Sequence, residues 1–392
     1  MVIMAESEKD LQCLLDKLAE WCSKWRMRLN TEKSKILHFR GSRCKRSQFV
    51  FKYAGTDLET VEHYKYLGIF FDEFLKFEYG IEVLEKSAGR ALGCIISKFK
   101  YLKNAGYKTF KKLYESQVVP ISDYFSCLWS HKKLRTANKV HNKALRYFLG
   151  VSCKTPIYGM NGDIGWSTPV SRHYLNMLKY WNRLNTMDDS RIAKIVFNWD
   201  VLDPSIGWAN TMAQLFEKLN IYDLFETRIC CNLEYVTNQI SILEQSNWLE
   251  NLETKPKLRT YKTFKYIFET EWYVQSDLSR SRRSILAQIR FGVLALKIET
   301  GRYRNLAIHE RTCDVCEGGY VEDEKHFICK CNFYDDIRGE LYNRVTERQN
   351  QDFMNYSDDD KFSYLLSKSQ RYLAEFLEKA WIRRRGKIYE QN

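Results

Sequence analysis

The stretch LQCLLDKLAEWCSKWRMRL at residues 11–29 carries the most regular pattern in the chain and decides how its fold begins. Its apolar residues recur at steps of three and four, the spacing of one face of an α-helix, with lysine and glutamate on the opposite face. These apolar residues are Leu11, Leu14, Leu15, Leu18, Trp21, Cys22, Trp25 and Leu29. We therefore predict an amphipathic helix whose broad apolar stripe faces a core.

Strand patterns flank this helix. Val2–Ala5 is a short apolar run suited to a buried strand, and residues 36–40 and 49–53 alternate with a period of two. Residues 64–71 (YKYLGIFF) are typical of a hairpin, in which Gly68 permits close backbone approach. The chain is therefore expected to open with a strand, a helix, further strands and a hairpin.

Helical spacing of Leu, Ile, Phe and Tyr dominates from residue 81 onward. We predict helices over 81–102, 107–129 and 136–149, and further helical segments to about residue 298. Residues 150–169 hold four glycines and two prolines, and we interpret them as a loop at a domain boundary. The predicted fold class is α+β, mostly α.

Composition places the chain among globular proteins. Its 392 residues suggest two or three folded units, and 44% hydrophobic and 28% charged residues argue against disorder. The start MVIMAE lacks the pattern of a secretion signal, and no apolar run reaches the roughly 18 residues of a membrane span. We expect no membrane partner, and reduced thiols in the nucleus or cytoplasm, since the twelve cysteines are scattered.

Most of the net charge of +13 lies in one segment. Residues 86–146 contain fourteen lysines and arginines against Glu115 and Asp123, a net charge of +12. We interpret this segment as a surface that binds a polyanion such as RNA or an RNA–DNA hybrid; a solvated helix face is the alternative. Phe99, Tyr101, Tyr107 and Phe110 lie between the charges and either pack as core or contact sugar and base faces. The predicted contact residues are Lys98, Lys100, Lys103, Lys108, Lys111, Lys112, Lys132, Lys133 and Arg135.

A C-x2-C-x9-H-x4-C array near the C-terminus has the spacing of metal ligands. Its members are Cys313, Cys316, His326 and Cys331, and three thiolates with one imidazole suit tetrahedral Zn²⁺. Cys329 is an alternative fourth ligand, but its H-x2-C spacing is unusually short. Since all four coordination positions are filled by protein, the array indicates a structural zinc rather than a catalytic one.

Two aspartate pairs resemble catalytic motifs but have simpler interpretations. Phe333-Tyr334-Asp335-Asp336 matches the aromatic-x-Asp-Asp pattern of polymerase metal sites. Helical spacing follows it directly, and acidic residues are favoured in a first helical turn, so we predict a helix start there. Residues 188–189 are expected in a loop between helices, and no P-loop, G-x-S-x-G or G-x-G-x-x-G motif is present.

The N-terminal pattern resembles the stretch that follows the Tyr-Ala-Asp-Asp box in reverse transcriptases of LINE (non-LTR) retrotransposons. The resemblance rests on Val2–Ala5, on the helix with Trp21 and Trp25, and on Leu29-Asn30-Thr31-Glu32-Lys33-Ser34. Tyr66-Leu67-Gly68 resembles that family's primer-grip hairpin. Lys33 matches the lysine of the family's N-x-x-K-[ST] segment, which implies a leaving-group acid; a solvated lysine beside a strand is the alternative.

Later segments are similar to the same family, weakly in the helical middle and more specifically at the end. Residues 113–129 and 145–151 look like the thumb, and 169–181 like the region behind it. Residues 313–338 are similar to the family's C-terminal zinc knuckle, through Asp323-Glu324-x-His326-Phe327 and Cys331-x-x-Tyr334-x-x-x-Arg338. The implied parts are a palm remnant (1–80), a basic helical thumb (81–150), a helical connection (151–300), a zinc knuckle (301–345) and a helical tail (346–392).

One departure from the family changes the expected activity. The resemblance places the family's metal-binding aspartates and nucleotide-binding segments upstream of Met1, so we expect a chain that starts just after the Tyr-Ala-Asp-Asp box. Mg²⁺ is expected only in a complete polymerase, and the missing N-terminal polymerase part is a candidate partner. The expected function is that of a reverse transcriptase fragment that holds template and primer but does not polymerise alone. The alternative is a non-enzymatic zinc-containing nucleic-acid-binding protein or an inert retrotransposon relic.

Overall fold

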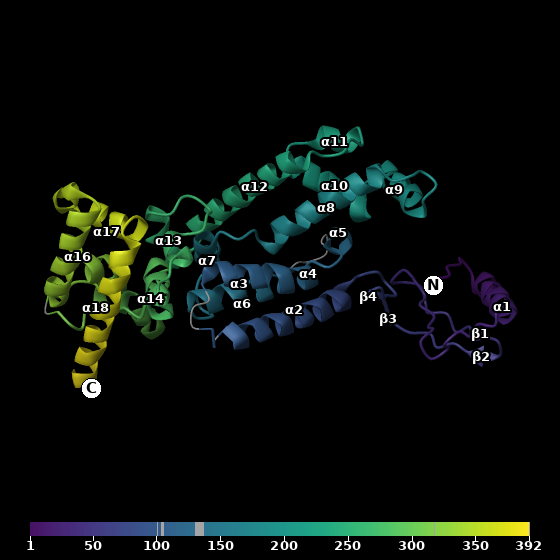
Figure 1. Ribbon diagram of the computed structural model, residues 1–392, viewed down its shortest axis with the longest axis horizontal. Coiled ribbons are helices and arrows are strands. Elements are labelled where there is room, and N and C mark those ends of the chain that lie inside the picture. Colours follow the sequence, from purple (N-terminus) through teal and green to yellow (C-terminus); the bar gives the residue numbers. More distant parts are fainter. Residues whose placement is uncertain (100, 103–105, 130–136, 317, 392) are drawn as a thin grey trace. The chain divides into compact units, whose positions relative to one another are not determined.

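The computed structural model describes residues 1–99, 101–102, 106–129, 137–316 and 318–391 (Figure 1). It divides into two compact units, Met1–Lys86 and Ser87–Asn392. Helices make up most of the described chain and strands are few and short, which confirms a mostly helical α+β fold.

The first unit is built on α1 (Glu8–Lys24), which confirms the predicted N-terminal helix. Leu15 and Cys22 are buried, but Trp21 and Trp25 are 50% and 62% exposed, with ring centroids 6.3 Å apart. The stripe that meets the core is therefore narrower than predicted, because the helical period does not say how far the core extends around the helix.

Two antiparallel hairpins follow α1. The described strands are β1 (Lys52–Tyr53), β2 (Thr56–Asp57), β3 (His63–Tyr66) and β4 (Ile69–Asp72). The pairing of Tyr66 with Ile69 confirms the predicted second hairpin. Its two-residue turn has Leu67 at φ +48° and Gly68 at φ +89°, the left-handed conformations that a tight hairpin turn requires.

Three strand predictions were wrong in whole or in part. Val2–Ala5 forms no strand, and Val2 and Met4 are exposed. In 36–40 only Ile36 forms a bridge, to Thr60, and in 49–53 only the last two residues pair. Alternation shows which side chains face a core, but a strand also needs a neighbouring backbone to pair with. In the described hairpins each strand pairs with the other strand of the same hairpin. Ile36 and Phe51 are still buried, with Leu15, Tyr53 and Leu58.

The regular secondary structure assigned in the described part of the second unit is helical. Its helices, with α2 beginning in the first unit, are α2 (Glu78–Phe99), α3 (Tyr107–Leu113), α4 (Val119–Ser122), α5 (Ser126–Trp129), α6 (Ala137–Leu149), α7 (Ile157–Ile164), α8 (Pro169–Asn185), α9 (Ile192–Leu202), α10 (Gly207–Lys218), α11 (Tyr222–Glu226), α12 (Leu233–Glu253), α13 (Trp272–Gln275), α14 (Arg280–Arg290), α15 (Lys297–Thr300), α16 (Asp335–Arg348), α17 (Asp358–Ser367) and α18 (Gln370–Gln391). The helices predicted over 81–102 and 136–149 correspond to α2 and α6.

The helix predicted over 107–129 is broken into α3, a π-helical turn at 114–118, α4 and α5. A proline lies in the first turn of α4, and Phe125 takes a left-handed conformation with φ +53°. Both interrupt regular helix hydrogen bonding, which an apolar repeat alone does not reveal.

The interpretation of 150–169 as a loop was wrong in part, because α7 lies within it and is largely buried, while 151–156 and 165–168 are not helical. A Cβ added to Gly162 would lie 2.5 Å from Trp248, and one added to Gly159 would lie 2.7 Å from Phe291. Gly159 and Gly162 therefore serve close helix packing, whereas Gly165 ends α7 in a left-handed conformation with φ +61°. The adjacent Asp163 is fully buried and pairs with Arg290 of α14 at 2.7 Å.

Two hydrophobic cores organise the second unit. One surrounds the fully buried Trp181 and is formed by helices α8 to α12; α8 and α12 lie side by side in Figure 1. The other runs from Ala88 in α2 to Ala380 in α18. It includes the predicted zinc segment through buried Phe327 and Tyr334, so that segment packs into a large core instead of standing alone.

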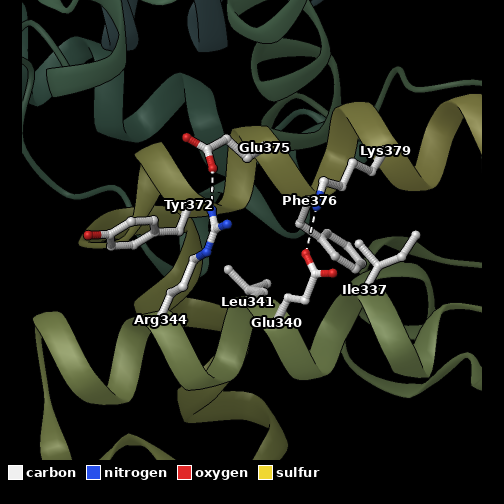
Figure 2. Close-up of a pocket in the computed structure, with 8 residues that line it drawn as sticks. All are labelled: Ile337, Glu340, Leu341, Arg344, Tyr372, Glu375, Phe376 and Lys379. Carbon is white, nitrogen blue, oxygen red and sulfur yellow. Dashed lines mark hydrogen bonds and ion pairs between the residues drawn. The ribbon is translucent and has the colours of Figure 1, made fainter.

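Helix α16 packs against α18 through apolar side chains, which include Leu341 and Phe376, beside two ion pairs (Figure 2). Glu340 pairs with Lys379 at 2.6 Å, and Arg344 with Glu375 at 2.7 Å. The remaining space is about 10 Å³, room for roughly one water molecule. This is a packing interface rather than a ligand site.

Candidate metal centre and basic surface

A short hairpin presents the first two cysteines of the array. The Cys313 N–H donates to the Tyr320 carbonyl at 2.9 Å, and Thr312 bridges Val321 in antiparallel fashion. Gly319 has φ +65°, which lets the chain turn back within a few residues. The C-x-x-C segment thus lies in the loop that this bridge closes.

A single helical turn presents the other two residues. The His326 N–H donates to the Asp323 carboxylate at 2.7 Å, which caps the start of the turn, and the Cys331 N–H donates to the His326 carbonyl at 2.8 Å. The turn from His326 to Lys330 is π-helical. The H-x4-C spacing therefore brings imidazole and thiol to the same side of one turn.

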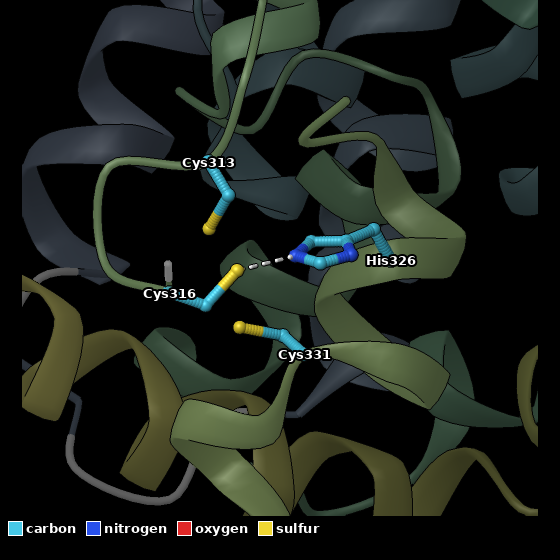
Figure 3. Close-up of side chains that lie close together, drawn as sticks. All are labelled: Cys313, Cys316, His326 and Cys331. Carbon is cyan, nitrogen blue, oxygen red and sulfur yellow. Dashed lines mark hydrogen bonds between the residues drawn. The ribbon is translucent and has the colours of Figure 1, made fainter. Parts of the chain in front are cut away.

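The four predicted ligands meet in one cluster (Figure 3). Their ligand atoms all lie within 4.8 Å of one another, and Cys316 Sγ lies 3.4 Å from His326 Nε2. Cys313, His326 and Cys331 are buried and Cys316 is half-buried. In a tetrahedral shell with metal–sulfur bonds of about 2.3 Å, sulfurs lie roughly 3.8 Å apart, so small side-chain rotations complete the shell. This group can hold a metal ion.

The thiols of Cys313 and Cys331 influence each other's pKa. The Cys313 thiol donates to Glu322 Oε1 at 3.6 Å. Its interaction with the Cys331 thiol, together with burial, raises the pKa of Cys313 to about 12, and the same interaction lowers the pKa of Cys331. Metal ligands must be deprotonated, so binding of an ion here displaces protons and is favoured as pH rises. His326 Nε2 faces the sulfurs, while its buried Nδ1 has no hydrogen-bond partner among the described residues.

Buried ion pairs and carbonyl contacts hold the cluster in the second unit. Arg338 donates to the carbonyls of Ile328, at 2.9 Å, and Cys331. Glu322 pairs with Arg384 of α18 at 2.8 Å, with both side chains at most 3% exposed. These contacts fix the backbone on either side of the ligands, and they give Arg338 of the C-x-x-Y-x-x-x-R motif a structural role.

Cys329 lies outside the cluster. Its thiol is buried beside Tyr342, and burial raises its pKa to about 11. The geometry thus agrees with the H-x4-C assignment over H-x2-C. Asp335 and Asp336 occupy the first turn of α16, which confirms a helix start. Arg383 donates to Asp336 at 2.6 Å and lowers the pKa of that carboxyl to about 2.

Among the described residues, the Cys/His cluster is the only group of three or more Cys, His, Asp or Glu side chains placed to hold a metal ion. Residues 188–189 lie between α8 and α9, as predicted for a loop.

The structure brings the segment at Asn30 beside the second hairpin. The Lys33 N–H donates to the Asn30 side chain at 3.0 Å, and the Tyr64 hydroxyl donates to the Lys33 carbonyl at 3.0 Å. The Lys33 side chain is exposed. Of the three grip-like residues, Tyr66 is half-buried and the turn residues Leu67 and Gly68 are exposed.

Four of the nine predicted nucleic-acid contacts lie in the described chain. Lys98 at the end of α2, and Lys108 and Lys112 on α3, are exposed, while Lys111 lies 3.8 Å from Glu115. The other five, Lys100, Lys103, Lys132, Lys133 and Arg135, lie outside the described residues. The aromatic residues divide: Tyr107 and Phe110 are buried, Phe99 packs against Phe110 at 5.2 Å between ring centroids, and Tyr101 is 85% exposed.

A basic stripe on α6 was not singled out from the sequence. Lys139, Lys143 and Arg146 follow one another at helical spacing of four and three, so they share one face, and α6 contains no acidic residue. Lys139 and Lys143 are exposed and Arg146 is half-buried. The spacing itself was the available signal.

No family model, no curated protein and no solved structure matches the chain. Within the part of the chain that the structure describes, no helix combines the length and apolar character needed to cross a membrane.

Proposed function

We propose that the cluster of Cys313, Cys316, His326 and Cys331 binds one structural Zn²⁺. The observation that carries this proposal is the convergence of three sulfurs and one imidazole nitrogen within 4.8 Å. Sulfur and nitrogen ligands favour zinc over Mg²⁺ or Ca²⁺, which take oxygen. Four protein ligands leave no position for a substrate, so the ion stabilises the module instead of catalysing a reaction.

Elemental analysis of the purified chain and its variants tests the zinc site. Cys313→Ser, Cys316→Ser and Cys331→Ser should each bind less than one zinc per chain. Cys329→Ser is the informative control, because it removes a neighbouring thiol that lies outside the cluster. Cys230→Ser, at an exposed cysteine in the second unit, controls for the loss of any thiol. Loss of zinc only in Cys329→Ser would contradict the ligand assignment, and a zinc-free wild-type chain would contradict the site.

We further propose that the chain is the part of a LINE-type reverse transcriptase that holds template and primer. Support comes from the sequence resemblance, from the exposed lysines of α2 and α3, and from the basic stripe on α6. Such a surface binds phosphate backbones with little sequence preference, since counterion release dominates the affinity. RNA and RNA–DNA hybrids are the proposed ligands, in the nucleus or cytoplasm.

Binding of a labelled RNA–DNA hybrid at several salt concentrations tests this proposal. Each phosphate contact adds about −0.9 to the slope of log affinity against log salt, so six contacts give roughly −5. Lys108→Gln and Lys112→Gln should each remove one phosphate contact and make the slope shallower by about 0.9. Lys368→Gln, at an exposed lysine directly after α17, is the matched control. An affinity that barely changes with salt would contradict the proposal.

Primer extension distinguishes this proposal from the alternative that the chain is a non-enzymatic nucleic-acid-binding protein or an inert relic. The described residues contain no carboxylate cluster for a metal pair, so the chain alone should extend no primer with Mg²⁺ or Mn²⁺. Addition of a separate polymerase part from a LINE element should restore extension if the chain holds template and primer. Binding without restoration favours the non-enzymatic reading, and metal-dependent extension by the chain alone would contradict both.

A further inference from the structure

An open hollow of about 510 Å³ lies where the C-terminal end of α6 meets the N-terminal end of α14. Its lining includes Arg146, Gly150, Arg280, Ser281 and Ser284. Both helices belong to the second unit, and 134 residues of sequence separate Arg146 from Arg280. The hollow is therefore a product of the fold and invisible in any local pattern.

Gly150 allows the two helix ends to meet. It has φ +70°, and a Cβ there would lie 2.9 Å from that of Ser284. The Ser284 hydroxyl donates to the Gly150 carbonyl at 2.6 Å, and Arg283 Nε donates to the Phe148 carbonyl at 2.9 Å. Helix α14 thus satisfies carbonyls that α6 leaves free at its end, and it covers part of their negative potential.

The hollow carries positive charge without a matching carboxylate. Among the described residues no ion pair is formed by Arg146 or Arg280, and the buried Arg146 Nε has no hydrogen-bond partner. Arg280 instead lies over the Tyr147 ring, 4.7 Å from its centroid. A bound anion would offset this unpaired, partly desolvated charge.

The neighbouring Arg282, in the same turn of α14, differs from Arg280 because it forms ion pairs. It pairs with Glu378 at 2.7 Å and with Glu375 at 3.7 Å, so its charge is already compensated. The first turn of α14 contains no acidic residue, and helix geometry leaves the N–H groups of Arg280 and Ser281 without an intrahelical acceptor. Guanidinium forks, hydroxyls and free N–H groups together suit a tetrahedral oxyanion.

We propose that this hollow is a phosphate-binding subsite that takes a phosphodiester of the bound nucleic acid. The inference rests on the proposed nucleic-acid-holding function and extends it. Lys139 and Lys143 lie on the face of α6 that ends at Arg146, so the basic stripe leads along the helix to the hollow. A strand that follows this stripe delivers a backbone phosphate to Arg146 and Arg280.

Two single variants and a matched control test the subsite. Arg146→Gln and Arg280→Gln remove charge from the hollow, and Arg282→Gln removes the same charge from the same turn of α14 outside it. Hybrid binding is measured from 50 to 200 mM salt on zinc-loaded protein, with circular dichroism to verify folding. Each hollow variant should make the slope of log affinity against log salt shallower by about 0.9. Over that range of salt it should therefore lose about 3.5-fold less affinity than the wild-type chain, whereas Arg282→Gln keeps the wild-type slope. An equal change in all three variants would overturn the subsite.

Calorimetric titration with inorganic phosphate and pyrophosphate distinguishes the source of the phosphate. Weak phosphate binding by the wild-type chain and by Arg282→Gln that is lost in both hollow variants supports the subsite. If the wild-type chain then binds no hybrid, the proposed function fails but the subsite stands. Phosphate binding lost in the variants with unchanged hybrid slopes would overturn the assignment to a nucleic-acid backbone. Absence of both effects in the hollow variants would overturn the subsite itself.

Discussion

Replacement of Asp163 by Asn tests how α7 is held in the second unit. Asp163 and Arg290 are both fully buried and form two parallel hydrogen bonds of 2.7 Å. The hydroxyls of Tyr261 and Tyr273 donate to the same carboxylate, each at 2.8 Å. Glu271 lies 3.3 Å from Arg290 and remains as a second, less favourably placed carboxylate.

The substitution keeps the size of the side chain but turns one acceptor into an NH₂ donor that faces other donors. Breaking a buried pair costs about 3–5 kcal/mol, and because Glu271 remains, the expected loss of stability is about 3 kcal/mol. Urea unfolding followed by tryptophan fluorescence measures it, with Asp277→Asn at an exposed aspartate as control. A loss below about 1 kcal/mol for Asp163→Asn would refute the reasoning that this pair fixes α7.

Two further changes have expected outcomes of defined sign. Burial raises the pKa of Asp123, but hydrogen bonds from His173 and Arg172 outweigh burial and lower the pKa to about 2. About 2 kcal/mol of folding stability that is present above pH 4 is therefore lost as pH falls toward 2. Asp123→Asn should flatten the acid side of the curve of stability against pH, and an unchanged curve would contradict this. Gly162→Ala places a Cβ 2.5 Å from an indole carbon of Trp248 in α12 and should lower the free energy of urea unfolding by about 2 kcal/mol. Gly89→Ala, which points into open space on α2, should be neutral or stabilising. Similar effects of the two variants would contradict close packing at α7.

The metal cluster was predictable because its geometry is local. Cys313 and Cys316 lie in one bridged loop, and His326 and Cys331 on one turn, so short spacing along the chain already places each pair. The hairpin at Leu67 was predictable for the same reason, since a two-residue turn closes it.

The glycine-rich segment and the hollow depend on partners distant in sequence. Whether Gly162 marks a turn or a close helix contact depends on Trp248, which no local pattern links to it. Likewise Trp21 fits the helical stripe, but its exposure reflects how little core the first unit offers on that side. Strand lengths failed because alternation reports burial and not backbone pairing.

X-ray absorption at the zinc edge, combined with the metal content of the purified chain, tests the central claim most directly. The account predicts one Zn²⁺ per chain, surrounded by three sulfurs at about 2.3 Å and one nitrogen at about 2.0–2.1 Å, with no oxygen ligand. Substitution of His326 by Ala should remove the nitrogen or the metal, and Cys329→Ser should leave the spectrum unchanged. A zinc-free chain, a shell of four sulfurs or a shell containing water would contradict the account.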